Sequence, residues 1–156
     1  MPATRKPAHI DAEHAPLQLE HFLPYRLSIL SNTVSQTIAM DYQSRYDISM
    51  TEWRVMAVLA RFEGLSAREV AERTAMDKVA VSRALSRLVA AGRVDRTTHD
   101  NDKRRSVLQL SAAGWTMHDE VAPMARARER ELLARLDPEE RVWLTRILDK
   151  LLSKSH

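Results

Sequence analysis

Cysteine is absent from the chain, glycine occurs only 3 times, and aromatic residues make up 5% of the sequence. Without cysteine there are no disulfide bonds, thiolate zinc sites, iron–sulfur clusters or thiol redox sensors. The scarcity of glycine also disfavours a large sheet, which needs turn glycines and β-branched residues. We therefore expect a mainly α-helical chain of ordinary domain size, with or without dimerising arms.

Long apolar runs and the usual catalytic motifs are missing as well. No run of about 18 apolar residues suggests a membrane span, and no signal peptide is recognisable. The sequence also lacks a phosphate-binding glycine loop, a nucleophile elbow and paired histidines at helical spacing. We expect a soluble cytoplasmic protein that is not an enzyme, needs no cofactor or metal, and does not associate with membranes.

Positive charge is concentrated in one part of the chain. The net charge is +3, yet the segment 77–105 carries +4, from eight basic and four acidic residues, so the remainder is −1. A local excess of cations is typical of nucleic-acid contacts, although a solvated helix face produces the same pattern. The segment is therefore a candidate nucleic-acid interface.

Amphipathic helices are predicted at both ends of the chain. Apolar residues recur at steps of three or four from about Leu19 to Tyr46, with Pro24 at a helix start or kink, and again after the helix-start pattern "DPEE" at 137–140. These helices need partners for their apolar sides, and the central part is too small to cover both. We expect them to pack across a two-fold axis in a homodimer, with a monomeric bundle as the alternative. The expected organisation is an arm at 1–18, a dimerisation helix at 19–48, a central lobe at 49–112 and C-terminal dimerisation helices at 113–156.

Two short helices are predicted in the middle of the central lobe. "SARE" at 66–69 has the spacing of a capping box and starts a helix that ends near Thr74. Asp77 is the expected cap of the next helix, and Gly92 lies just past its end. Two helices joined by the short "TAM" turn form a helix-turn-helix candidate.

The elements on either side of this pair are a helix and a hairpin. Thr51 is the expected cap of the preceding helix, which we expect Gly64 to end. After the pair, Arg93–Thr98 and Ser106–Ser111 are predicted strands around a charged tip, "HDNDKRR". The expected fold is therefore α+β, mainly α with a small β-hairpin.

The helix that Asp77 opens carries a polar face beside its apolar stripe. Such a face, with small side chains and arginines that reach guanine acceptors, is what a major-groove helix needs. An ordinary solvated face is the alternative for this helix alone. The exposed positions are Lys78, Val79, Ser82, Arg83, Ser86 and Arg87.

The stretches "LSAREVAERTAMDKVAVSRALSRLVAAGRVDR" and "NDKRRSVLQLSAAG" resemble the winged helix-turn-helix of MarR-type transcriptional regulators. The resemblance follows residues 20–152 in element order and is most specific over 65–114. It implies an obligate homodimer that represses transcription from a pseudo-palindromic site on double-stranded DNA. Each protomer would place a recognition helix, about Asp77–Ala91, in the major groove and a wing arginine in the minor groove.

The resemblance also extends the set of expected DNA contacts. Phosphate contacts are expected from Ser66 and Arg68. Arg104 matches the wing arginine and Asp102 would orient it, but Arg105 replaces a small residue, so either arginine could enter the narrow groove. The expected DNA-binding residues are Ser66, Arg68, Lys78, Val79, Ser82, Arg83, Ser86, Arg87, Asp102, Lys103, Arg104 and Arg105.

MarR-type proteins commonly release DNA when a small aromatic acid or phenol enters a crevice, so the resemblance implies such a ligand here. Polar groups lie beside the apolar face of the first long helix, where they could bind the carboxylate or hydroxyl of a ligand. Trp53 could form a flat wall of the crevice. Ser28 and Asn32 could instead bridge helices at a dimer interface. The alternative function is a winged-helix protein–protein interaction module. The candidate ligand-binding residues are His21, Tyr25, Ser28, Asn32 and Trp53.

Overall fold

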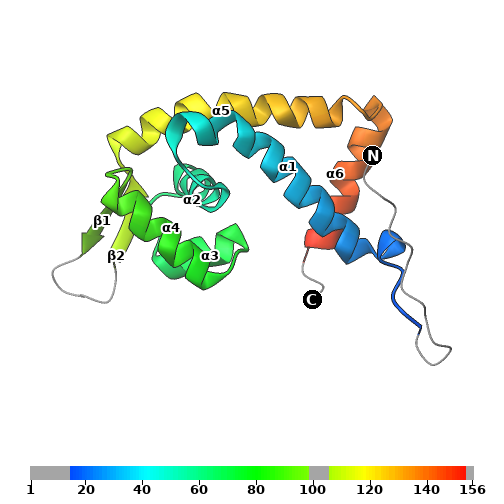
Figure 1. The fold of residues 1–156 in the computed structure, drawn as a ribbon, viewed down its shortest axis with the longest axis horizontal. Helices are drawn as coiled ribbons and strands as arrows, with labels where there is room; N and C mark the ends of the chain where they lie inside the picture. Colours follow the sequence, from blue (N-terminus) through cyan, green and yellow to red (C-terminus); the bar gives the residue numbers. More distant parts are fainter. Residues whose placement is uncertain (1–14, 99–105, 154–156) are drawn as a thin grey trace. The chain divides into compact units, whose positions relative to one another are not determined.

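The fold is known from a computed structural model, which describes residues 15–98 and 106–153 (Figure 1). It is mainly helical with one two-stranded hairpin, so the predicted fold class is confirmed. None of the described helices is long and apolar enough to cross a membrane. The elements are a short 3-10 helix η1 (Leu19–His21), α1 (Leu23–Tyr46), α2 (Met50–Arg61), α3 (Ala67–Thr74), α4 (Lys78–Ala90), β1 (Val94–Thr98), β2 (Ser106–Leu110), α5 (Ala112–Leu133) and α6 (Pro138–Leu152).

The chain forms two compact units, residues 1–33 and 34–156, and α1 begins in the first unit and ends in the second. Pro24 lies in the first turn of α1, where its missing N–H costs nothing. Three leucines of the predicted apolar face, Leu23, Leu27 and Leu30, belong to the first unit and are exposed. Further along α1, in the second unit, Tyr42 is fully buried.

Side-chain caps start most of the helices in the second unit. The expected capping box is present at Ser66 and Glu69, and Asp77 accepts a hydrogen bond from the Ala80 N–H at 3.0 Å. Asp137 and Glu140 form another box at the start of α6, as the "DPEE" pattern predicts. These local signals therefore position α3, α4 and α6 correctly.

The predicted cap of α2 is wrong. Ser49, not Thr51, caps this helix and forms a capping box with Glu52. The helix also ends earlier than expected, at Arg61, and Gly64 follows in the left-handed conformation at φ 73°. Gly92 does lie just past α4, at φ 69°, a conformation that favours glycine.

The hairpin is tied to the helix pair through the core. β1 and β2 pair antiparallel, with Val94 opposite Leu110, and the Leu108 N–H donates to the Leu65 carbonyl at 2.8 Å. Leu108 is fully buried in the same cluster as Val81 and Leu85 of α4. The core therefore fixes the base of the hairpin relative to α4.

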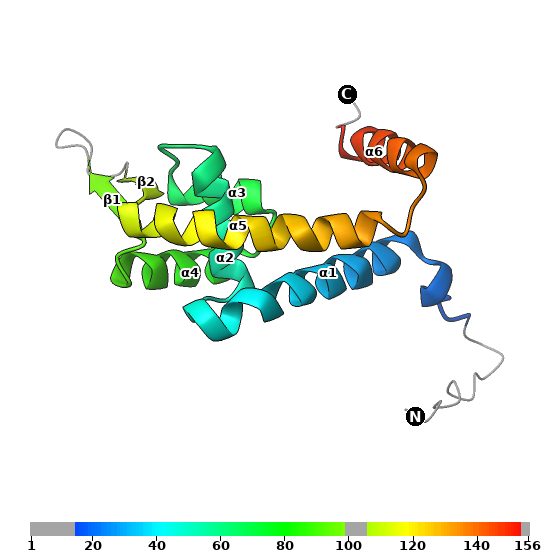
Figure 2. The same cartoon turned by 90° about the horizontal axis from the view of Figure 1, so that it is seen from above.

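Helix α5 packs on α2 and the hairpin (Figure 2), and polar contacts join it to the end of α1. Arg128 donates two hydrogen bonds to the Asp41 carboxylate, both at 2.7 Å, and these hold the pKa of Asp41 below its ordinary value. The Tyr46 hydroxyl donates to Glu120, which raises the pKa of Tyr46. Two side chains of α1 therefore contact α5.

Helix α6 has no buried residue. Its apolar side chains recur in pairs every four residues, so they occupy one broad face of the helix. That face contains Trp143, Leu144, Ile147, Leu148, Leu151 and Leu152, all of them exposed.

Candidate nucleic-acid interface

Helix α4 separates a buried side from an exposed side as its sequence predicts. Val81, Ala84, Leu85 and Leu88 are buried. All six predicted contact positions on this helix are exposed, and more than half of the surface of the apolar Val79 is accessible. The exposed set is Lys78, Val79, Ser82, Arg83, Ser86 and Arg87.

Helices α3 and α4 bring several predicted contacts together. Arg68, Lys78 and Ser82 line one hollow of about 310 Å³ between the two helices. Arg68 also pairs with Glu72 on its own helix at 2.9 Å, which partly neutralises its charge. The Ser66 hydroxyl takes part in the cap: it accepts from the Glu69 N–H and donates to the Glu69 carboxylate.

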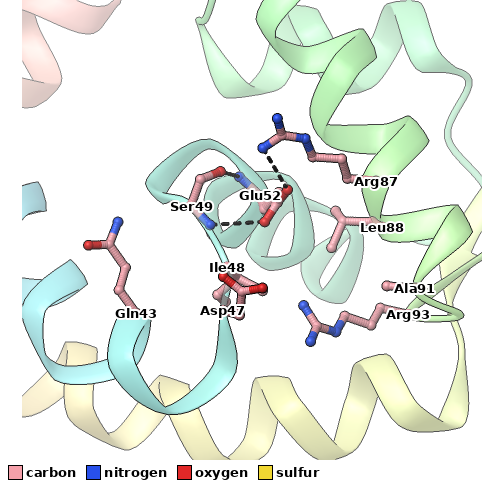
Figure 3. Close-up of a pocket in the computed structure, with 9 residues that line it drawn as sticks. All are labelled: Gln43, Asp47, Ile48, Ser49, Glu52, Arg87, Leu88, Ala91 and Arg93. Carbon is pink, nitrogen blue, oxygen red and sulfur yellow. Dashed lines mark hydrogen bonds and ion pairs between the residues drawn. The ribbon is translucent and has the colours of Figure 1, made fainter.

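Arg87 lies on the opposite edge of α4 and faces a polar pocket of about 550 Å³ (Figure 3). Its guanidinium lies 3.9 Å from the carboxylate of Glu52, which forms the capping box of α2 with Ser49. Arg93 lines the same pocket and donates to the Tyr46 carbonyl at 3.0 Å. Sequence reasoning missed this contact between α2 and α4, because nothing local links Glu52 to Arg87.

The remaining predicted DNA contacts lie at the tip of the hairpin. Asp102, Lys103, Arg104 and Arg105 are outside the described residues. The strands that lead to the tip are described, and the exposed side chains of β1 include Arg96. The predicted choice between Arg104 and Arg105 for the minor groove therefore stays a prediction.

Four candidate ligand residues lie on or just before the beginning of α1 in the first unit, and Trp53 lies in the second. Tyr25 lines a hollow of about 290 Å³ on α1, whereas the Ser28 hydroxyl donates to the Pro24 carbonyl within the helix. His21 and Asn32 are exposed and line neither described hollow. Trp53 lines a different pocket of about 160 Å³, in the second unit.

The Trp53 pocket has an aromatic wall and two polar groups. Trp53 contacts Tyr42 at 5.9 Å and stacks on His118 of α5 at 5.7 Å between ring centroids. Burial raises the pKa of Tyr42 to about 12, so its hydroxyl keeps its proton at neutral pH. Arg54 lines the pocket too, and donates to the Ser35 hydroxyl at 3.3 Å. The sequence suggested Trp53, but not the rings packed around it.

Helices α2, α3 and α4 precede the antiparallel hairpin of β1 and β2, and α3 and α4 are joined by a short turn. This order of elements defines a winged helix-turn-helix protein. Residues 46–105 match the family model described as "MarR family". Over these residues the chain is similar to the MarR family of DNA-binding transcriptional regulators. Members of this family regulate transcription and are not enzymes.

Individual relatives show the same similarity. The chain is 28% identical over 141 residues to the HTH-type transcriptional repressor Rv2887 of Mycobacterium tuberculosis, covering 90% of this chain and 96% of that protein. It is 26% identical over 128 residues to the multiple antibiotic resistance protein MarR of Escherichia coli, covering 81% and 89%. The match to the regulator BilQ of Clostridium symbiosum is shorter, 28% identical over 88 residues, covering 56% of this chain and 61% of that protein.

Solved structures share the fold. A MarR/EmrR family regulator from Acinetobacter sp. ADP1 superimposes with a TM-score of 0.78 at 26% identity, covering 86% of this chain and 95% of that one. A variant of Escherichia coli MarR complexed with operator DNA gives a TM-score of 0.73 at 25% identity, covering 88% and 99%.

Proposed function

We propose that the chain is a repressor that binds a pseudo-palindromic operator as a homodimer, with α4 of each protomer in the major groove. The observation that carries this proposal is the exposed, cationic and small-residue face of α4, held by a fully buried opposite side. The half-sites would lie one helical turn apart, roughly 34–36 Å. Occupancy of the operator would block transcription.

The exposed apolar faces support the homodimer. Helix α6 buries none of its leucines within the described chain, and the beginning of α1 exposes three more. Monomeric soluble proteins rarely expose contiguous apolar surface on this scale. A second copy of the chain presents the same faces, so each face has a matching partner in a two-fold dimer.

Arg83 is the residue whose replacement tests the DNA contact. It lies on the exposed side of α4, and we expect Arg83→Ala to weaken operator binding by about 1–3 kcal/mol and to relax base preference at one position per half-site. Arg104→Ala should weaken binding more evenly across sequences. Selection from a random DNA pool, followed by affinity measurements on mutated sites, gives both quantities.

Arg126→Ala is the matched control, because it removes the same charge from an exposed position on α5. It should leave both affinity and base preference unchanged. Unaltered operator binding by both Arg83→Ala and Arg104→Ala would contradict the interface. Weak salt dependence of wild-type binding to duplex DNA would favour the protein–protein interaction module, since phosphate neutralisation releases counterions.

We also propose that a small aromatic acid or phenol relieves repression by binding beside Trp53. The pocket offers aromatic rings, the Arg54 cation for a carboxylate, and the protonated Tyr42 hydroxyl. Its volume of about 160 Å³ limits the ligand to a single substituted ring. The candidates on α1, His21, Tyr25, Ser28 and Asn32, would then matter less than Trp53.

A thermal-shift series with benzoates and phenols tests the ligand. A ligand at 100 times its dissociation constant stabilises the folded state by about 2.7 kcal/mol, so wild type should show a clear rise in Tm. Arg54→Gln should abolish the rise for benzoates more than for phenols, and Tyr25→Ala should leave it unchanged. A rise that disappears with Tyr25→Ala but survives Arg54→Gln would place the ligand on α1 instead.

A further inference from the structure

Glu52 differs from the other capping glutamates of the chain. Three capping boxes are present in the described residues, and their glutamates are Glu52, Glu69 and Glu140. Glu69 and Glu140 are exposed, but Glu52 is only 5% exposed and is the one acidic residue buried in the described ranges. A capping role alone does not require burial, and a buried carboxylate is costly without a partner.

The partner of Glu52 comes from the DNA-binding helix. One carboxylate oxygen, Oε2, accepts from the Ser49 N–H at 2.9 Å, while the other, Oε1, faces the Arg87 guanidinium at 3.9 Å. The Arg87 side chain is 75% exposed, so it approaches Glu52 from the solvent side. The second arginine of the pocket, Arg93, is already held by the Tyr46 carbonyl. Arg87 is therefore the cation that Glu52 attracts from α4 (Figure 3).

We propose that Glu52 competes with the DNA phosphates for Arg87 and so lowers the affinity of the regulator for DNA. This inference rests on the proposed function, in which α4 faces DNA. A carboxylate in a poorly solvated position is screened less than a surface one, so its attraction for Arg87 persists at moderate salt. Moving Arg87 to a phosphate leaves Glu52 buried without its cation, which opposes binding. Glu52 thus sets how much non-specific phosphate contact α4 makes.

Glu52→Gln tests this competition and keeps the helix cap, because glutamine also serves at the third position of a capping box. The assay measures dissociation constants for a duplex selected from a random pool by the wild-type protein. Each phosphate contact changes affinity about threefold between roughly 50 and 200 mM salt, so two released arginines per dimer amount to about tenfold. We expect Glu52→Gln to bind more tightly than wild type, with an advantage about tenfold greater at the lower salt than at the higher salt.

A double-mutant cycle with Arg87→Ala separates competition from a general charge effect. Glu52→Gln should tighten binding when Arg87 is present and should have no effect in the Arg87→Ala background. Glu140→Gln, which removes the same charge from another capping box, should leave the dissociation constant unchanged. Equal tightening in both backgrounds, or no tightening by Glu52→Gln while wild type binds normally, would overturn the inference and leave the proposed function standing. Failure of wild type to select any duplex would overturn the proposed function itself.

A measurement on the wild-type protein tests the competition even if Glu52→Gln is too unstable to assay. Side-chain ¹⁵Nε relaxation reports how tightly an arginine is held. The Arg87 side chain should be more ordered than Arg83 in the free protein, and it should change environment when the selected duplex is added. An Arg87 as disordered as Arg83 in the free protein would overturn the competition.

Discussion

Gly114→Ala should lower the free energy of unfolding by about 3 kcal/mol, although alanine is the better helix former by about 1 kcal/mol. Gly114 lies in the first turn of α5 and is buried. A Cβ added there would lie 2.1 Å from the Arg93 carbonyl oxygen and 3.3 Å from a methyl group of Leu110. The first distance is far inside van der Waals contact with a backbone atom, so the structure has to shift.

The Arg93 backbone cannot move away easily. Its N–H donates to the Leu88 carbonyl at 2.9 Å, and its carbonyl accepts from the Ser111 N–H at 3.1 Å. These bonds tie the end of α4 to the start of α5, just before β1 begins. Moving the Arg93 carbonyl would break the second bond and shift the base of the hairpin. The clash therefore outweighs the gain in helix propensity.

Thermal unfolding at a fixed protomer concentration measures the effect of Gly114→Ala. For a chain of this size, a loss of about 3 kcal/mol corresponds to a fall in Tm of about 6–12 °C. The matched control is Ala113→Gly at the neighbouring exposed position, which should cost no more than about 1 kcal/mol. An unchanged or higher Tm for Gly114→Ala would mean that the close approach of α5 to Arg93 is wrong.

The elements of the fold follow from local sequence because their signals act over three or four residues. Asp77 and Asp137 each satisfy N–H groups in the first turn of their own helix, so a cap can be recognised without knowing the tertiary structure. The wrong cap predicted for α2 can also be corrected from local sequence. The Ser49-Met-Thr-Glu52 stretch has the capping-box spacing, whereas Thr51 is followed three residues later by Arg54, which cannot accept a hydrogen bond.

The candidate site was predictable only where it lies on one element. The exposed face of α4 follows from helical periodicity, because the buried Val81, Leu85 and Leu88 fix which side points outward. The Glu52–Arg87 contact joins residues 35 positions apart, and the stack of Trp53 on His118 joins two helices distant in sequence. Such pairs depend on how helices pack, which no local pattern specifies.

Leu148→Glu should convert the dimer into a monomer and weaken binding to a two-half-site operator by about 100-fold or more, since the two half-sites then bind independently. Leu148 lies on the exposed apolar face of α6, where a carboxylate would be buried against the second copy without a partner.

Lys150→Glu, on the charged side of the same helix, changes the charge by more and should leave both mass and affinity unaltered. Light scattering should give the single-chain mass of 17.8 kDa for Leu148→Glu and twice that mass for Lys150→Glu. Circular dichroism confirms that each variant is folded at the concentration used, because dimer stability depends on concentration. A Leu148→Glu protein that stays dimeric with wild-type operator affinity would show that α6 is not part of the interface.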